Sequence, residues 1–106
     1  CGAILDETSL AGADLRNAKL RGAMCRGTRF GTSQLDMADF RGADLENAAL
    51  DSVESIKGTD FSLCTGLEHQ LENLLSRDAM ELDHWNPFTR NTARKSLESL
   101  KNEMVG

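Results

Sequence analysis

The sequence has few of the residues on which catalytic and metal sites depend. It contains two histidines, His69 and His84, and three cysteines, Cys1, Cys25 and Cys64, in 106 residues. Their spacing matches neither a CxxC zinc pattern nor an even disulfide framework. No motif places a cysteine beside a base and an oxyanion site. We therefore predict a protein that is not an enzyme and has no catalytic residue, no cofactor and no metal.

The chain also lacks a long hydrophobic run and an excess of positive charge. No stretch approaches the roughly 18 consecutive apolar residues of a membrane span, so we expect no transmembrane segment. The formal net charge of −5 argues against general binding to nucleic-acid phosphates. With 40% hydrophobic and 27% charged residues, the composition predicts a folded soluble domain with one modest core.

What the sequence does contain is a repeat of five residues. A large apolar residue recurs at every fifth position, and the residue two places before it is always Ala, Ser or Thr. Neither a helical period of 3.6 nor a strand period of 2 holds that register. The large residues, which we predict to be the inward-facing core, are Leu5, Leu10, Leu15, Leu20, Cys25, Phe30, Leu35, Phe40, Leu45 and Leu50.

A coil with four five-residue sides explains this register. Residues 20 apart would then stack at about the inter-strand spacing of 4.8 Å. After Leu50 the frame slips by one residue, which predicts a bulge near residues 51–55. Gly or Asn, which tolerate left-handed backbone angles at corners, stands two places after the central residue at Gly12, Asn17, Gly22, Gly27, Gly42 and Asn47.

This pattern resembles the pentapeptide-repeat family, whose motif is Ala-(Asp/Asn)-Leu-x-x. The clearest copies are residues 13–17 and 43–47, and the resemblance covers residues 1–61. It implies an all-β solenoid, a right-handed quadrilateral β-helix, which we assign to residues 1–64. Because Cys1 is already in phase with the repeat, we expect the sequence to begin inside a longer precursor.

Residues 65–106 are predicted to form an α-helical cap. Apolar residues follow a helical period over about residues 66–82, and Thr65 with Glu68 fits a capping box at the start. A second helix should begin near Asn91 or Thr92, after a connector that Pro87 keeps from being helical. Two such helices would cover the apolar slots and the unpaired edge of the last coil.

The connector holds two aromatic residues that admit two interpretations. Trp85 and Phe88 either pack the connector onto the helices or the last coil, or serve as anchors in an interface. The first coil presents unpaired backbone groups as well. We therefore predict that a protein partner contacts Ile4 and Ser9 of the first coil, or Trp85 and Phe88 of the connector.

Charges on the outer faces are expected to pair between stacked coils. The exception is Arg21, which stacks below Arg41. Either the two side chains splay apart in water, or a carboxylate of a partner lies between them. The predicted pairs are Arg16 with Asp36, Lys19 with Asp39, and Arg26 with Glu46.

The segment of residues 86–97 is similar to a C-terminal segment of chloroplast thylakoid-lumen and cyanobacterial pentapeptide-repeat proteins. This resemblance implies a lumenal location and a partner that is a larger membrane-associated photosynthetic complex, for which the chain is a subunit or assembly factor. In those proteins a later Gly-Cys pairs with a cysteine near the end of the solenoid. Glu98 and Ser99 replace it here, so we predict no disulfide at Cys64. The matching residues are Asn86, Pro87, Thr89, Arg94, Lys95, Ser96 and Leu97.

The alternative function comes from bacterial members of the family, which imitate duplex DNA, bind DNA gyrase and reside in the cytoplasm. Residues 1–61 form only about three coils, on the order of 15 Å of solenoid, which corresponds to fewer than about five base pairs. The same residues mix acidic side chains with an early group of basic ones. An interaction module without nucleic-acid binding is therefore the favoured function.

Overall fold

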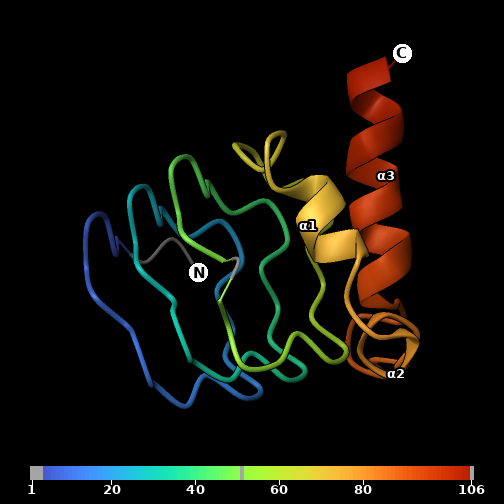
Figure 1. Ribbon diagram of the computed structural model, residues 1–106, viewed down its shortest axis with the longest axis horizontal. Helices are drawn as coiled ribbons and strands as arrows, with labels where there is room; N and C mark the ends of the chain where they lie inside the picture. Colours follow the sequence, from blue (N-terminus) through green and yellow to red (C-terminus); the bar gives the residue numbers. More distant parts are fainter. Residues whose placement is uncertain (1–3, 51, 106) are drawn as a thin grey trace.

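Residues 4–65 form a coil with four sides per turn. The structure, a computed structural model, describes the backbone of residues 4–50 and 52–105 and the side chains of residues 4–50 and 52–102. Parallel β-bridges join residues 20 positions apart, one on each five-residue side, so the fold is of the β-helix type (Figure 1). The bridges of the first turn join Ile4 to Met24, Ser9 to Arg29, Asp14 to Gln34 and Lys19 to Asp39.

In the described residues the coils are joined by isolated bridges rather than by continuous strands, so the expected all-β solenoid is a β-helix-type coil without a regular sheet. Each side spends two of its five residues in a turn, which leaves room for one bridging residue between corners. Backbone hydrogen bonds still join the coils, for example from Leu5 N to Met24 O (2.7 Å) and from Leu15 N to Gln34 O (2.9 Å).

The corners of the coil are left-handed. The predicted glycine and asparagine corners are confirmed, with φ of 73° at Gly12 and 65° at Asn17. Glu7, Thr32 and Met37 take φ of 57°, 58° and 63° at equivalent corners. Such angles are uncommon for residues with a side chain, and most of all for a β-branched one. The coil geometry therefore overrides the preference of these three residues.

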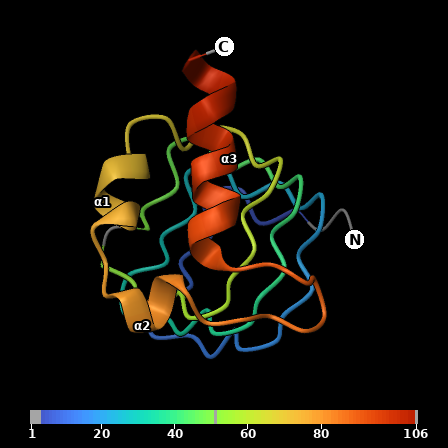
Figure 2. The ribbon, with the colours of Figure 1, turned by 90° about the vertical axis from the view of Figure 1, so that its right-hand side faces the viewer.

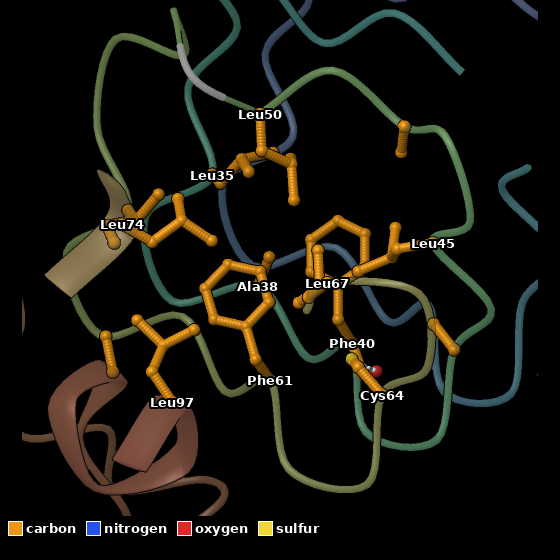
Figure 3. Close-up of a cluster of buried hydrophobic side chains, with 14 of the residues drawn as sticks. Leu35, Ala38, Phe40, Leu45, Leu50, Phe61, Cys64, Leu67, Leu74 and Leu97 are labelled. Atoms are coloured by element: carbon orange, nitrogen blue, oxygen red, sulfur yellow. Dashed lines mark hydrogen bonds between the residues drawn. The ribbon is translucent and has the colours of Figure 1, made fainter. Parts of the chain in front are cut away.

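Large side chains fill the inside of the coil. From Cys25 through Leu50 the central residues are fully buried, whereas Leu5, Leu10, Leu15 and Leu20 are partly buried and pack against the same core. The Phe40 ring lies 5.8 Å from Phe30, edge to face, and 5.8 Å from Phe61, stacked. Figure 3 shows Phe40 and Phe61 among the converging leucines.

Small residues occupy the second inward position. Where this position holds a hydroxyl, the hydroxyl is bonded to a carbonyl inside the coil, as from Thr28 to Leu5 O and from Thr59 to Leu35 O, both at 2.6 Å. A buried hydroxyl without such a partner would be costly. Threonine and serine are therefore tolerated beside alanine because the coil supplies an acceptor.

One extra residue is accommodated between Ala49 and Ser55. Arg29 bridges to Ala49, 20 positions later, whereas Gln34 bridges to Ser55, 21 positions later. All later bridges keep the spacing of 21, ending with Asp44 to Thr65. The slip in the repeat is thus a local bulge, as the sequence indicates, and residue 51 within it lies outside the described residues.

Within the described residues, three helices follow the solenoid: α1 (Leu71–Leu75), α2 (Ala79–Leu82) and α3 (Ala93–Val105). The expectation of one helix over residues 66–82 is wrong, because α1 and α2 are separate short helices. The capping box is wrong too. Thr65 bridges to Asp44 as part of the solenoid, and Gly66 has φ of 85°. The second helix begins as expected, since Thr92 Oγ1 accepts the N–H of Lys95 (3.1 Å).

The helices cover the last coil (Figures 1 and 2). Central N–H groups that bond to the next coil elsewhere in the solenoid bond here to side chains. Leu50 N donates to Gln70 Oε1 (3.1 Å), and Phe61 N donates to Ser96 Oγ (3.0 Å). Ile56 N likewise donates to Glu81 Oε1 (2.9 Å). The solenoid edge is therefore satisfied by side chains as well as covered by apolar surface.

Candidate functional site

The connector between α2 and α3 is organised around one buried side chain. Asn86 is fully buried, and its Nδ2 donates to Gly58 O (2.8 Å) on the solenoid. Its Oδ1 accepts the N–H groups of Phe88 (2.9 Å) and Thr89 (3.2 Å). An antiparallel bridge between Asn86 and Asn91 closes the loop. The connector is thus fixed to the solenoid by a buried hydrogen bond and held in shape by its own local bonds.

The two aromatic rings of this connector point outwards. Trp85 is 51% exposed and Phe88 is 77% exposed. Of the two interpretations of these rings, packing against the helices or anchoring an interface, the exposure favours the second. A rigid loop also loses little conformational entropy when a partner covers it.

The other predicted contact residues lie elsewhere on the solenoid. Ile4 is 72% exposed, and Ser9 is exposed on the next side of the first turn. Neither residue lies beside the connector. The structure instead brings Phe88 next to the side formed by residues 17–21 and 37–41. The predicted surfaces are therefore separate, and Phe88 of the connector faces a hollow.

This hollow has a volume of about 400 Å³ and lies between the connector and one side of the solenoid. Phe88 and Thr89 line it on the connector side. Lys19, Arg21 and Arg41 line it on the solenoid side, together with Asp39 and Met37. Three cationic side chains and one carboxylate therefore meet beside an exposed aromatic ring, in a chain whose net charge is −5.

The carboxylate of the hollow is held by a bidentate arginine. Arg41 donates to Asp39 through Nε (2.9 Å) and Nη2 (2.8 Å), and the Arg41 backbone N–H donates as well (3.1 Å). Partial burial works to raise the pKa of Asp39, but the bonds from Arg41 and the charge of Arg21 outweigh it, so this pKa is lowered. Asp39 is accordingly ionised at neutral pH and neutralises part of the cationic charge.

The pairing between coils that the sequence indicates is corrected by the structure. Arg41, not Lys19, is the ion-pair partner of Asp39. An Asp two residues before an Arg accepts the backbone N–H of that Arg, and its carboxylate is thereby placed beside the guanidinium. Elsewhere Arg16 pairs with Asp14 (2.7 Å) rather than Asp36, and Arg26 pairs with Asp6 (2.8 Å) rather than Glu46.

The described cysteines have no features of a reactive site. Cys25 and Cys64 are buried free thiols, as predicted for Cys64, and Cys1 lies outside the described residues. Burial raises the pKa of Cys25 to about 11, with Asp6 and Asp44 adding to the effect. Burial also raises the pKa of Cys64. Thiols of this kind are poor nucleophiles at neutral pH.

Two further searches of the described part of the chain give no site. No group of three or more His, Cys, Asp or Glu side chains there is placed to hold a metal ion. No helix there is long and apolar enough to cross a bilayer. The hollow beside Phe88 therefore remains the candidate functional site.

Comparison with known proteins identifies the repeat. Residues 2–36 match the family model of pentapeptide repeats in eight copies. The β-bridges continue the same coil to Thr65, so the coil extends beyond the matched segment. Proteins built from these repeats generally serve as structural or interaction modules, without catalytic activity of their own.

Comparison with whole proteins adds little to this assignment. A search of curated proteins gives no match. Among solved structures, the chain is similar to alr5209, a pentapeptide repeat protein from Nostoc Pcc 7120, with 19% identity and a TM-score of 0.23. The match covers 59% of this chain and 64% of that chain. At this TM-score the likeness says nothing further about the site.

Sequence reasoning found part of this site. The exposed aromatic residues and the stacking of Arg21 on Arg41 follow from the sequence. The placement of Phe88 and Thr89 beside those arginines does not, because it depends on how Asn86 docks on Gly58. The sequence shows an asparagine, Asn86, immediately before Pro87. It does not show that this asparagine is buried, because a connector has no periodic pattern from which burial can be predicted.

Proposed function

We propose that this chain is a non-enzymatic protein-interaction module that binds its partner through the connector. The observation that supports the proposal most strongly is the exposure of Trp85 and Phe88 on a loop that is pinned by Asn86. Aromatic residues on a preorganised surface are typical of the centre of protein interfaces. The pentapeptide-repeat solenoid acts as the rigid block that carries this loop.

The proposal extends to a location and a kind of partner. The similarity of residues 86–97 to thylakoid-lumen proteins favours a place in the chloroplast thylakoid lumen and a role as subunit or assembly factor of a photosynthetic membrane complex. In the structure, Asn86, Ser96 and Thr92 of this segment bind the last coil or cap α3. The segment therefore stabilises the fold. The proposed lumenal location is supported only by the resemblance of this segment to thylakoid-lumen proteins.

No observation favours the alternative of a DNA-mimicking, gyrase-binding protein of the bacterial cytoplasm. A DNA mimic needs a continuous acidic face. The side of the solenoid beside the connector instead carries Lys19, Arg21 and Arg41.

Retention of the native partner tests the proposal. A tagged chain is expressed in its native host and purified with its associated proteins, alongside the variants Trp85→Ala and Phe88→Ala. We expect each variant to lose most of the partner while keeping the circular dichroism of the folded chain, because both side chains are exposed.

The matched control is Met80→Ala, which truncates another exposed large apolar side chain (75%) outside the connector. It should retain the partner. Undiminished retention by both connector variants would contradict the proposal. A variant charged at Ile4 and Ser9 that alone lost the partner would move the binding surface to the first coil.

A further inference from the structure

The first described turn of the solenoid has an open backbone edge. One turn later, Arg29 bonds back to it through both backbone groups: its N–H donates to Thr8 O (3.0 Å), and its C=O accepts the N–H of Leu10 (2.7 Å). The equivalent residues of the first turn therefore direct their own N–H and C=O away from the solenoid. Within the described residues these groups have no hydrogen-bond partner. The residues placed in this way are Ser9, Asp14 and Lys19.

The apolar inside of the solenoid is uncovered at the same end. The central residues of later turns are fully buried from Cys25 onwards, but those of the first turn are only partly buried. This end lies opposite the helices (Figure 1). Unpaired backbone groups beside uncovered apolar side chains are typical of a surface that another chain covers. The partly buried side chains are Leu5, Leu10, Leu15 and Leu20.

The other end of the solenoid is closed. Side chains of Gln70, Glu81 and Ser96 accept N–H groups of the last coil, and the helices cover it (Figures 1 and 2). The open edge of one copy therefore cannot stack on the last coil of another, which excludes a head-to-tail filament of this kind. An open edge can meet only a second open edge, and such a contact closes after two copies.

A turn of the same shape is the partner that fits this edge. Each side offers one bridging residue before a left-handed corner, so an extended strand would pair with one side alone. In an antiparallel pair, a residue exchanges both of its backbone hydrogen bonds with the residue opposite. Ser9, Asp14 and Lys19 each present both groups. The first turn of a second copy, running in the opposite direction, offers the same groups in return.

We propose that two copies of this chain associate head to head through their first turns, about a two-fold axis that crosses the solenoid. This inference goes beyond the proposed interaction function and does not depend on it, because the first turn lies apart from the connector. Backbone hydrogen bonds and the covered leucines hold the pair together. Residues 4–22 contain three acidic and three basic side chains, so the contact is balanced in charge although each chain carries −5.

The charges on the edge favour one register of the pair. A two-fold axis through opposite sides of the turn would place Asp14 against Asp14 of the second copy, or Lys19 against its counterpart. An axis through the corner between these two residues places Asp14 against Lys19 twice, and it places Ile4 against Ser9. Asp14 is already bonded to Arg16 (2.8 and 2.7 Å). The contact with Lys19 therefore selects the register, whereas exposed ion pairs add little to the strength.

Charge reversal tests the pair and its register together. In this register Lys19→Asp makes both facing pairs of side chains acidic, and Asp14→Lys makes both basic. Each variant should dissociate about tenfold more readily than the original chain in sedimentation-velocity measurements, because like charges then face each other. An equimolar mixture of the two variants should recover the pair, since every facing pair again joins opposite charges.

The matched control is Lys95→Asp, the same charge reversal at an exposed lysine of α3 in the cap. It should change the dissociation constant by less than about twofold, as expected of a distant, screened charge. Hydrogen exchange followed by NMR should slow with rising protein concentration at the amides of Ser9, Asp14 and Lys19, but not at that of Glu98. Thermal unfolding followed by circular dichroism establishes that each variant is folded.

Several results would overturn the proposal. A chain that stays monomeric at every concentration reached would leave the edge to another coil, whether of a different protein or of a longer chain. Equal weakening by Lys19→Asp and Lys95→Asp would show a general charge effect. A mixture of the two edge variants that associates no better than its components would exclude this register. Association without slower exchange at the three edge amides would place the contact on another surface.

Discussion

Single residues limit how closely the coils and the cap can stack, and Gly66 has the least space of the described glycines. It lies at the end of the solenoid with φ of 85°, and a Cβ atom there would collide with the backbone N and Cα of Glu46. Gly42 has a similar φ of 73° but open space around the Cβ position. Substitution of Gly42 by alanine would therefore introduce backbone strain alone, whereas substitution of Gly66 would introduce both strain and a steric clash.

We predict that Gly66→Ala destabilises the fold far more than Gly42→Ala. The strain at Gly42 should cost about 1 kcal/mol of unfolding free energy, whereas the added clash at Gly66 should bring the loss to about 3 kcal/mol or more. Urea denaturation followed by circular dichroism measures both. Similar losses for the two variants would show that coil and cap do not meet as closely as described.

At the scale of residues, the five-residue period predicts which side chains are buried, but it does not predict every corner with positive φ. Buried Phe30 and Leu35 follow from the five-residue spacing, as do the corners at Gly12 and Asn17. The corners at Glu7 and Thr32 do not, because neither residue prefers positive φ. The coil imposes this angle at every fifth residue from Glu7 to Asn47, whichever residue stands there.

At the scale of elements, the sequence indicates that helices cover the last coil but not how they do so. Thr65 was expected to start a helix, yet the final bridge of the solenoid engages it. Gln70 then sits at the start of α1 with its side chain bonded to Leu50 N and Ala48 O. Side chains that satisfy a distant backbone edge follow no local pattern, so sequence reasoning could not identify them.

The cap makes a testable prediction at Ser96. Its fully buried hydroxyl accepts the N–H of Phe61 and donates to Ala93 O (2.8 Å). Ser96→Ala would leave that N–H buried and unpaired, which should lower the unfolding free energy by about 1–3 kcal/mol. Chemical denaturation provides the measurement.

Ser99→Ala is the control, because Ser99 is exposed on the same helix α3. Its effect should stay within about 0.5 kcal/mol, since surface changes rarely exceed this. Equal effects of the two substitutions would mean that α3 does not cap the coil through Ser96.

At the scale of the whole molecule, the proposed function depends on bringing together segments that are distant in the chain. Residues 17–21 and 37–41 come from successive coils, and Phe88 comes from the connector beyond the second helix. The sequence indicates the stacked arginines and the aromatic pair separately. Their meeting in one hollow requires the docking of Asn86 on Gly58, which is a tertiary contact that no period in the sequence encodes.

Site-specific photo-cross-linking in the native host tests the central claim most directly. Benzoylphenylalanine is placed at position 88, beside the hollow, and in a second protein at position 29, exposed on another side of the solenoid. If the connector face is the interaction surface, irradiation will join a discrete partner to the chain from position 88 and not from position 29. A cross-link from position 29 alone, or from neither position while the partner still co-purifies, would contradict the account.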